Sequence, residues 1–369
     1  METTRREFVA KAGLALAAPA VIRSSAFGAD GTPAKRPPIK IGQIGTGNQH
    51  AYKLGTLRRL TELFEVVGVA GDDPGALGKA PKGECYQGLK WMSHDELLAV
   101  PGLQAVAVET EERLPIPVAL RCVRAGKHIH LDKPCGESLP AFKTLLDEAK
   151  AKDLTVQVGY MYRNNPAVQF CIKAVREGLI GKVFDLDAAM SRHDGDTYRK
   201  LIGTYRGGAP YIFACHLIDL AVTLMGEPER VRPFLRRTRP DGVLDNSLTV
   251  LEFPQDRLAT IRISITEAQG FQRRHLTVFG DKGTITVQPL EVKGNMSGGA
   301  VSLALEEEHG GYRKGVQNVE MPPPKDRYED QWREFAAVLN GESANPYTYE
   351  HDYTVHKCHL EACGLPLDV

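Results

Sequence analysis

The chain after residue 37 opens with an alternation of short apolar runs and amphipathic stretches. Ile39–Ile44 and Phe64–Ala70 are short, β-branched runs typical of buried strands, and the stretch from Ala51 to Leu63 between them has the apolar spacing of a helix. The same rhythm continues with a strand, a helix and a further strand, over Gln104–Val108, Pro115–Ala125 and Lys127–Leu131. This alternation predicts a parallel sheet with helices on both faces, which binds ligands at the carboxyl ends of its strands.

A glycine-rich turn directly follows the first of these strands. Its residues are Gly45, Thr46, Gly47, Asn48, Gln49 and His50. Gly45 permits the tight turn, and Gly47 lets the backbone approach a pyrophosphate, whose charge is stabilised by the free amides of the next helix. His50 occupies the place of the third glycine of a dinucleotide fingerprint. Because the turn lies between a strand and a helix, we predict that these six residues bind a dinucleotide.

Polar residues at two further strand ends refine this prediction. Asp72 or Asp73 is expected to accept hydrogen bonds from the adenosine ribose, although a solvated turn is the alternative for this pair. No Arg or Lys occurs between Val69 and Lys79, so a local partner for a 2'-phosphate is missing, and NAD is favoured over NADP, which stays possible. Two residues at the end of another strand are expected to contact the cofactor, unless they only shape a loop: Glu109 and Thr110.

Further motifs extend over nearly the whole chain after residue 37. They are Ala125–Pro134, Val158–Pro166, Gly178–Val183, Gly207-Gly208 leading to His216–Asp219, and Phe279–Thr284. Together with the glycine turn, they resemble the Gfo/Idh/MocA family of dehydrogenases, which usually have Glu-Lys-Pro where this chain has Asp132-Lys133-Pro134.

The resemblance implies an α/β protein of two domains. The first is a Rossmann domain, expected over 38–160, and the second is an α/β domain with an open, mostly antiparallel sheet, expected over 161–369. Alternating apolar and polar residues in the second part suit such a sheet, over Ser247–Phe253, Leu258–Thr266 and His275–Phe279. In this family the open sheet often mediates oligomerisation, so we expect a homodimer or homotetramer.

Lys133 is the first candidate for catalysis. Hydride transfer at a carbinol carbon needs a group that exchanges the hydroxyl proton and a cation that stabilises the alkoxide. Lys133 fits both needs, because it is fixed beside Pro134 at a strand end, where Asp132 and Lys133 are also expected to lie at the cofactor. A structural ion pair between Lys133 and Asp132 is the alternative.

His216 is the second candidate for catalysis. In similar family members this histidine lies by the substrate hydroxyl, as acid, base or binding partner. Asp219, one helical turn later, is expected to orient the helix. The alternative is a satisfied core histidine. This chain departs from the family four residues before His216, where many members have Asp and this chain has Ile212, so a carboxylate that relays the proton or holds the substrate is missing.

Other polar residues are candidates to compensate for that loss and to bind the substrate with His216. They are Tyr160, Tyr162, Arg163, His193 and Tyr211. The loop Ser191–Arg199, which contains His193, is polar enough to bind sugar hydroxyls, but a solvated hairpin explains it equally well.

The first 37 residues are predicted to be a signal peptide and linker. Thr4–Phe8 reads Thr-Arg-Arg-Glu-Phe and precedes the apolar stretch Ala12–Ile22, a pattern typical of a twin-arginine export signal. The apolar stretch has about eleven apolar residues, too few to span a bilayer. Two arginines before a fortuitous amphipathic helix are the alternative. The signal predicts a periplasmic protein that the twin-arginine machinery exports folded, with its dinucleotide tightly bound.

Charge and cysteine content exclude several other classes of function. Lys+Arg and Asp+Glu number 46 each and are scattered, so the sequence does not predict a nucleic-acid partner. The seven cysteines lack the paired spacing of a zinc site and are expected to be mostly free core thiols. The spacing of four residues near the C-terminus does not suit metal binding either, and no metal is predicted: His351, His356, Cys358 and His359.

The sequence therefore predicts an NAD(P)-dependent oxidoreductase that acts on a secondary alcohol of a sugar, cyclitol or derivative. One alternative is a glycoside hydrolase or lyase that uses bound NAD for transient oxidation and elimination, which the export signal and Ile212 favour. A second alternative is a binding protein that keeps the fold without the chemistry. The substrate itself is not specified by any motif.

Overall fold

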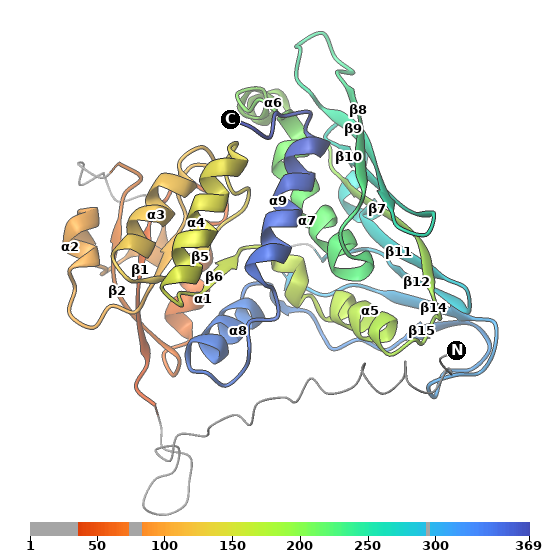
Figure 1. Cartoon of the computed structure of the whole chain (residues 1–369), viewed down its shortest axis with the longest axis horizontal. Coiled ribbons are helices and arrows are strands. Elements are labelled where there is room, and N and C mark those ends of the chain that lie inside the picture. Colours follow the sequence, from red (N-terminus) through yellow and green to blue (C-terminus); the bar gives the residue numbers. More distant parts are fainter. Residues whose placement is uncertain (1–35, 74–82, 293–295) are drawn as a thin grey trace, which may run out of the picture. The chain divides into compact units, whose positions relative to one another are not determined.

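The first sheet is built from six parallel strands (Figure 1). The computed structural model describes residues 36–73, 83–292 and 296–369; the predicted signal segment lies outside them. The strand order β3-β2-β1-β4-β5-β6 reverses between β1 and β4, which is where doubly wound sheets bind their ligands. The predicted parallel sheet is confirmed, with strands β1 (Ile39–Ile44), β2 (Phe64–Ala70), β3 (Trp91–Met92), β4 (Ala105–Val108), β5 (His128–Leu131) and β6 (Val156–Val158).

Within the described residues, four α-helices lie in the connections between these strands: α1 (Leu54–Arg59), α2 (His94–Leu98), α3 (Pro115–Arg124) and α4 (Leu139–Ala151). Local sequence sets where they begin. Ser93 and Glu96 form a capping box on α2, and the Ser138 hydroxyl accepts from the Ala141 amide at the start of α4. Proline stands in the first turn of both α3 and α4, where its missing amide proton costs nothing.

The helix predicted from Ala51 to Leu63 is wrong in its length. The chain forms a single 3-10 turn over Ala51–Lys53, and α1 ends at Arg59. The backbone amides of Leu63 and Phe64 both donate to the carbonyl of Leu60, so a tight turn brings the chain directly into β2. Apolar spacing continues through this turn because Leu60 packs in the same core as α1, not because the helix continues.

The second sheet has eight strands in the order β15-β14-β12-β11-β7-β10-β9-β8. Only β7 and β10 pair in parallel, so the predicted mostly antiparallel sheet is confirmed. Its strands are β7 (Val183–Ser191), β8 (Arg230–Arg236), β9 (Asn246–Phe253), β10 (Arg257–Ser264), β11 (His275–Gly280), β12 (Gly283–Val287), β14 (Val301–Leu305) and β15 (Gly315–Val319). A short ladder pairs β13 (Met296–Ser297) with β16 (Lys325–Asp326).

Helix α7 (Gly208–Met225) is the central helix of this second part and packs on β7, β9 and β10 (Figure 1). It is apolar and long enough to cross a membrane, but 94% of it is buried inside the protein, as expected for a core helix. Gly208 begins the helix with φ of 58°, and a Cβ there would lie 2.5 Å from the Leu244 carbonyl oxygen, so this close approach requires glycine.

The other helices of this part are α5 (Pro166–Arg176), α6 (Asp196–Ile202), α8 (Glu329–Leu339) and α9 (Tyr349–Ala362). Helix α9 packs on α7 and also on α4, and α8 contacts α1, so the last forty residues touch both sheets' helices. The opposite face of the large sheet leaves several large apolar side chains exposed, namely Phe234, Leu248, Leu258 and Val316.

Candidate active site

The glycine turn after β1 keeps the shape that a dinucleotide requires. Gly45 has φ of 96°, and a Cβ there would lie 2.4 Å from the Thr110 backbone nitrogen. A Cβ on Gly47 would lie 2.9 Å from an oxygen of Asp72. Within the described ranges, the amides of Gly47 and Gln49 donate to no protein acceptor. The turn therefore offers free amides in a cradle that side chains would fill, which fits a pyrophosphate.

Of the two acids after β2, Asp72 is the one that reaches this turn. Its carboxylate accepts from the backbone amides of Thr46, at 3.0 Å, and Glu111, at 2.8 Å. It therefore joins the glycine turn to the loop after β4, and its oxygens lie beside Gly47. Asp73 is exposed.

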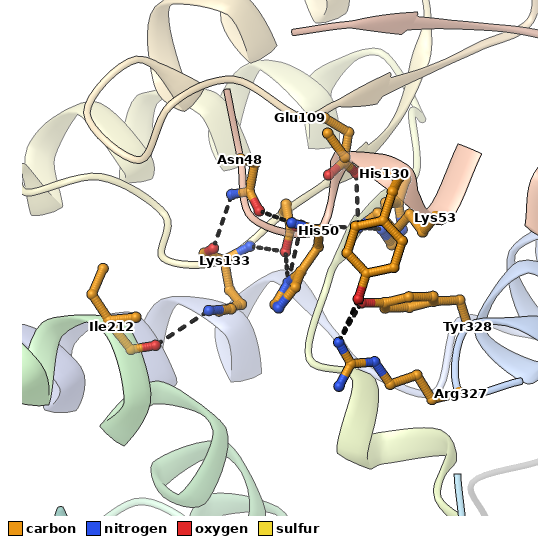
Figure 2. Close-up of polar contacts among 12 residues, drawn as sticks. Asn48, His50, Lys53, Glu109, His130, Lys133, Ile212, Arg327 and Tyr328 are labelled. Carbon is orange, nitrogen blue, oxygen red and sulfur yellow. Dashed lines mark hydrogen bonds and ion pairs between the residues drawn. The ribbon is translucent and has the colours of Figure 1, made fainter. Parts of the chain in front are cut away.

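A buried lysine lies behind the glycine turn and connects the ends of two neighbouring strands. The Lys53 ammonium lies 2.7 Å from the Glu109 carboxylate at the end of β4 and 3.2 Å from the Asp132 carboxylate after β5. It also donates to His130 Nε2 at 2.8 Å. Figure 2 shows these groups converging. The Lys53 side chain is 1% exposed, so the interaction is shielded from solvent.

The charge states of this cluster follow from burial and mutual attraction. Burial opposes the charge of Lys53, but Asp132 and Glu109 outweigh it and raise its pKa. Burial would raise the pKa of Asp132, yet the charge of Lys53 and a hydrogen bond from His50 hold it well below its usual range. Burial raises the pKa of Glu109 well above its usual range, against the opposing charge of Lys53. Of the two acids that contact Lys53, Asp132 is thus the one that ionises more readily.

Asp132 and Lys133 lie at the centre of the site, but they do not pair through their side-chain charges. An Asp132 oxygen accepts from the Lys133 backbone amide at 2.7 Å. The Lys133 ammonium instead donates to the Ile212 carbonyl oxygen of α7 at 3.2 Å (Figure 2). Asn48 of the glycine turn donates to the Lys133 carbonyl oxygen. Lys133 therefore spans from the Rossmann sheet to α7.

His50 lies beside this pair, with its Nδ1 3.3 Å from an Asp132 oxygen and its ring 6.1 Å from that of Tyr328. Burial lowers the pKa of His50 to about 4; the nearby charges of Lys133 and Arg327 act in the same direction, and Asp132 opposes them. His50 is therefore neutral at neutral pH, although the sequence indicated it only as part of the cofactor turn.

His216 faces the site from α7. Its ring packs edge-on against Tyr162, at 5.1 Å, and Tyr160, at 6.2 Å. Its Nδ1 is buried and has no hydrogen-bond partner in the part of the chain that the structure describes. Burial lowers its pKa well below the ordinary value, and the charges of Lys133 and Arg327 lower it further. His216 is thus a neutral imidazole.

The remaining predicted substrate residues are dispersed. Arg163 is buried in a bidentate ion pair with Asp219 of α7 and in a second ion pair with Asp352 of α9. It therefore joins these two helices. The Tyr211 hydroxyl donates to the Glu112 carbonyl oxygen on the Rossmann side. His193 is exposed on its loop. Thr110 is buried after β4.

Arg327 and Tyr328, which the sequence did not indicate, face the site from the C-terminal part (Figure 2). Arg327 donates through Nη2 to the hydroxyls of Tyr52 and Tyr328, each at 2.8 Å. Lys53 was missed as well. A lysine in an amphipathic stretch reads as a surface residue, and the segment around Arg327 reads as a polar linker. The one available signal was the set of acids and histidines at the ends of β4 and β5, which requires a buried cation.

Metal binding finds no support in the described residues, where no three His, Cys, Asp or Glu side chains are grouped to hold an ion. His351 bonds Asp219, and His359 bonds the Tyr211 carbonyl oxygen. His356 packs on the ring of Phe142. All seven cysteines are free thiols, and all but Cys85 are buried.

The parallel sheet, its glycine turn and the adjoining open sheet define a Rossmann-type oxidoreductase. Residues 39–160 match the family model "Oxidoreductase family, NAD-binding Rossmann fold", and residues 168–286 match "GFO/IDH/MocA C-terminal domain". The chain belongs to the Gfo/Idh/MocA family of oxidoreductases, as the resemblance in its motifs implied.

Named relatives agree with this assignment. Levoglucosan dehydrogenase of Pseudarthrobacter phenanthrenivorans is 28% identical over 44% of this chain and 42% of its own length. scyllo-Inositol 2-dehydrogenase (NAD(+)) of Bacillus subtilis is 27% identical over 59% of this chain and 68% of its own. Among solved structures, UDP-N-acetylglucosamine 3-dehydrogenase from Acidithiobacillus ferrooxidans has a TM-score of 0.70 at 18% identity, covering 89% of this chain and 97% of its own, and shows the same fold.

Replacing Lys53 by Met is expected to lower the free energy of unfolding by about 3–5 kcal/mol, because the Asp132 carboxylate is left buried without its cation. Urea unfolding followed by circular dichroism measures this change. Lys143→Met is the matched control, since that lysine is exposed and pairs with Asp147 on a helix surface, and it should change stability by less than about 0.5 kcal/mol. Equal losses in the two variants would contradict the assignment.

Proposed function

We propose that this protein is an NAD-dependent dehydrogenase that interconverts a secondary alcohol of a sugar or cyclitol with the corresponding ketone. The observation that carries the proposal is the convergence of a lysine ammonium, Lys133, with two neutral imidazoles, His50 and His216, at the ligand-binding edge of an NAD-binding sheet. Two relatives support it, since they are named for dehydrogenation of levoglucosan and of scyllo-inositol.

The residues present fit the dinucleotide. The free amides of the glycine turn would hold the pyrophosphate, and Asp72 would accept from the adenosine ribose hydroxyls. A carboxylate at that position favours NAD over NADP, because it repels a 2'-phosphate. Thr110 and the Asp132-Lys133 segment would line the nicotinamide side. When bound, NAD supplies the hydride acceptor or, reduced, the donor.

The side chains divide the remaining work. The Lys133 ammonium would donate a hydrogen bond to the reacting oxygen and stabilise negative charge as it develops there. His216 would take the hydroxyl proton during oxidation and return it during reduction, a role for which a neutral imidazole is suited. Tyr160 and Tyr162 fix the orientation of the His216 ring, and the Asp219 and Arg163 pair fixes α7.

A second function uses the same residues. In a glycosidase of this kind, a sugar hydroxyl is oxidised, the neighbouring proton is removed, the glycosidic group is eliminated, and the product is hydrated and reduced again without net consumption of NAD. Many family members have a carboxylate at the position of Ile212, whereas here Lys133 contacts the Ile212 backbone. This difference favours the glycosidase as the second candidate. A protein that binds sugar without turnover is the third possibility.

Cofactor content and turnover test the proposed function. Purified protein is expected to release NAD into the denatured supernatant, detected by absorbance and mass spectrometry, and free sugars or cyclitols are expected to reduce it. Lys133→Ala should lower kcat by about 100-fold or more while NAD stays bound, whereas Lys143→Ala should leave kcat unchanged. Release of aglycone from aryl glycosides without net NADH would instead identify the glycosidase. Unchanged turnover in Lys133→Ala would overturn the catalytic assignment.

We also propose that the protein is exported by the twin-arginine machinery to the periplasm, which the Thr4–Phe8 motif and the following apolar stretch support. Export in the folded state explains why the cofactor would be tightly held.

Fractionation of bacterial cells expressing the full chain tests the export proposal. The unaltered protein should appear in the periplasm, and the double variant Arg5→Lys/Arg6→Lys should stay in the cytoplasm, folded and loaded with NAD. Arg23→Lys, beyond the motif, is the control and should be exported normally. Equal distribution of the double variant and the control would refute the signal.

We propose a homo-oligomer assembled through the exposed face of the large sheet. Phe234 and Leu248 lie directly opposite each other on β8 and β9, and both are exposed apolar side chains.

The double variant Phe234→Asp/Leu248→Asp is expected to reduce the oligomer to a smaller species, because four such carboxylates would be buried in a two-fold interface. Light scattering coupled to size exclusion measures the mass. Leu114→Asp, an exposed apolar residue away from the large sheet, is the control. An unchanged mass for the double variant would place the interface elsewhere.

A further inference from the structure

Lys133 lies in the site without a carboxylate partner for its ammonium among the described residues. Its one hydrogen bond goes to the neutral Ile212 carbonyl oxygen. The neighbouring Asp132 carboxylate is already engaged by Lys53, by His50 and by the Lys133 backbone amide. The side chain is 5% exposed, so solvent does little to compensate its charge.

Arg327 is a second cation with incomplete compensation. Its guanidinium donates to two neutral hydroxyls, those of Tyr52 and Tyr328. Its nearest carboxylate, Glu291, lies 3.6 Å from Nη1 and is bonded more closely by Arg274. The Nε atom is buried and has no hydrogen-bond partner within the described ranges. The side chain is 15% exposed.

Lys133 and Arg327 both act on the same two histidines, His50 and His216. Figure 2 shows Lys133 and Arg327 on either side of the His50 ring. Both positive charges oppose protonation of His50 and of His216. The two imidazoles are therefore neutral and leave the charge of the site unchanged. In the part of the chain that the structure describes, two carboxylates lie beside these cations, and each is shared with a further cation: Asp132 with Lys53, and Glu291 with Arg274.

We infer that the substrate carries a carboxylate, which Lys133 and Arg327 hold, so that this dehydrogenase acts on sugar acids in preference to neutral sugars. The inference rests on the function proposed above. A buried cation is unfavourable unless paired, and an incoming carboxylate gains charge-assisted hydrogen bonds from both residues. The substrate would itself provide the negative charge that the protein lacks beside Lys133.

Matched pairs of substrates test the inference directly. NAD-loaded protein is incubated with hexuronates and hexonates, each beside its neutral amide, and with the parent hexoses and hexose 6-phosphates, and NADH formation is followed. We expect kcat/KM for the acids to exceed that for their amides by on the order of 100-fold, as for loss of one desolvated charge partner. The amide keeps the shape and the hydroxyls, so the difference isolates the charge.

A variant then assigns the charge to Arg327. Arg327→Gln should raise KM for the acids by on the order of 10- to 100-fold, with little change in kcat and no change for the amides. Calorimetry then measures binding of the same acids to the NADH-loaded protein, which cannot oxidise them. Their affinity should weaken in parallel, and this readout does not depend on turnover. Arg333→Gln, at an exposed arginine paired with Glu62 and Glu329, is the control.

The outcomes distinguish failure of the carboxylate inference from failure of the proposed dehydrogenase function. Turnover of amides or hexoses equal to that of the acids overturns the inference and leaves the dehydrogenase intact. Preference for the phosphates over the acids also overturns it, since the anion is then of another class. Loss of acid turnover in Arg327→Gln without a change in KM or in calorimetric affinity removes Arg327 from the binding site. Reduction of NAD by no sugar of any kind refutes the proposed function, and with it this inference.

Discussion

The ammonium of Lys53, buried between the carboxylates of Glu109 and Asp132, sets the geometry of the whole site. It attaches the glycine turn after β1 to the ends of β4 and β5, the strands on the far side of the point where the sheet order reverses. With Lys53 holding one oxygen of Asp132, the other is directed to the Lys133 backbone amide. Electrostatics in a solvent-shielded position thus fix the orientation of the Lys133 backbone, and a shorter or neutral side chain at position 53 would leave two acids facing each other.

A second constraint comes from α7, which is almost entirely buried yet carries polar residues on one side. His216 faces the candidate site, and Asp219, one turn further, forms an ion pair with Arg163 and a hydrogen bond with His351. The charge of Arg163 keeps the pKa of Asp219 below its usual value although burial opposes this. The Arg163–Asp219 ion pair therefore holds the helix at one turn. At the previous turn, the His216 Nδ1 atom has no hydrogen-bond partner among the described residues.

Much of the fold followed from local pattern. The parallel sheet and the glycine turn were predictable because period and turn chemistry are encoded over a few neighbouring residues. The mostly antiparallel second sheet was expected from the family resemblance, which alternating apolar and polar runs suit. The position of Lys133 at a strand end again followed from local pattern. Its partner did not: that the ammonium would reach Ile212 rather than Asp132 depends on how α7 packs against the Rossmann sheet, which no local pattern encodes. Arg327 and Tyr328 escaped prediction because they approach the site from nearly 280 residues beyond Tyr52, and the helix after the glycine turn was overestimated because apolar spacing continued through a turn at Leu60.

The 3-10 turn Ala51–Lys53 contacts the two halves of the site through adjacent side chains. Lys53 points to Asp132, and Tyr52 accepts from Arg327, while the following helix bonds Asp326 through Thr56. Whatever moves the glycine turn therefore acts on the Asp132 carboxylate and on the Arg327 guanidinium at once. Under the proposed function, the dinucleotide cradle and the anion site at Arg327 share this turn, so any effect of one ligand on the affinity for the other is reciprocal.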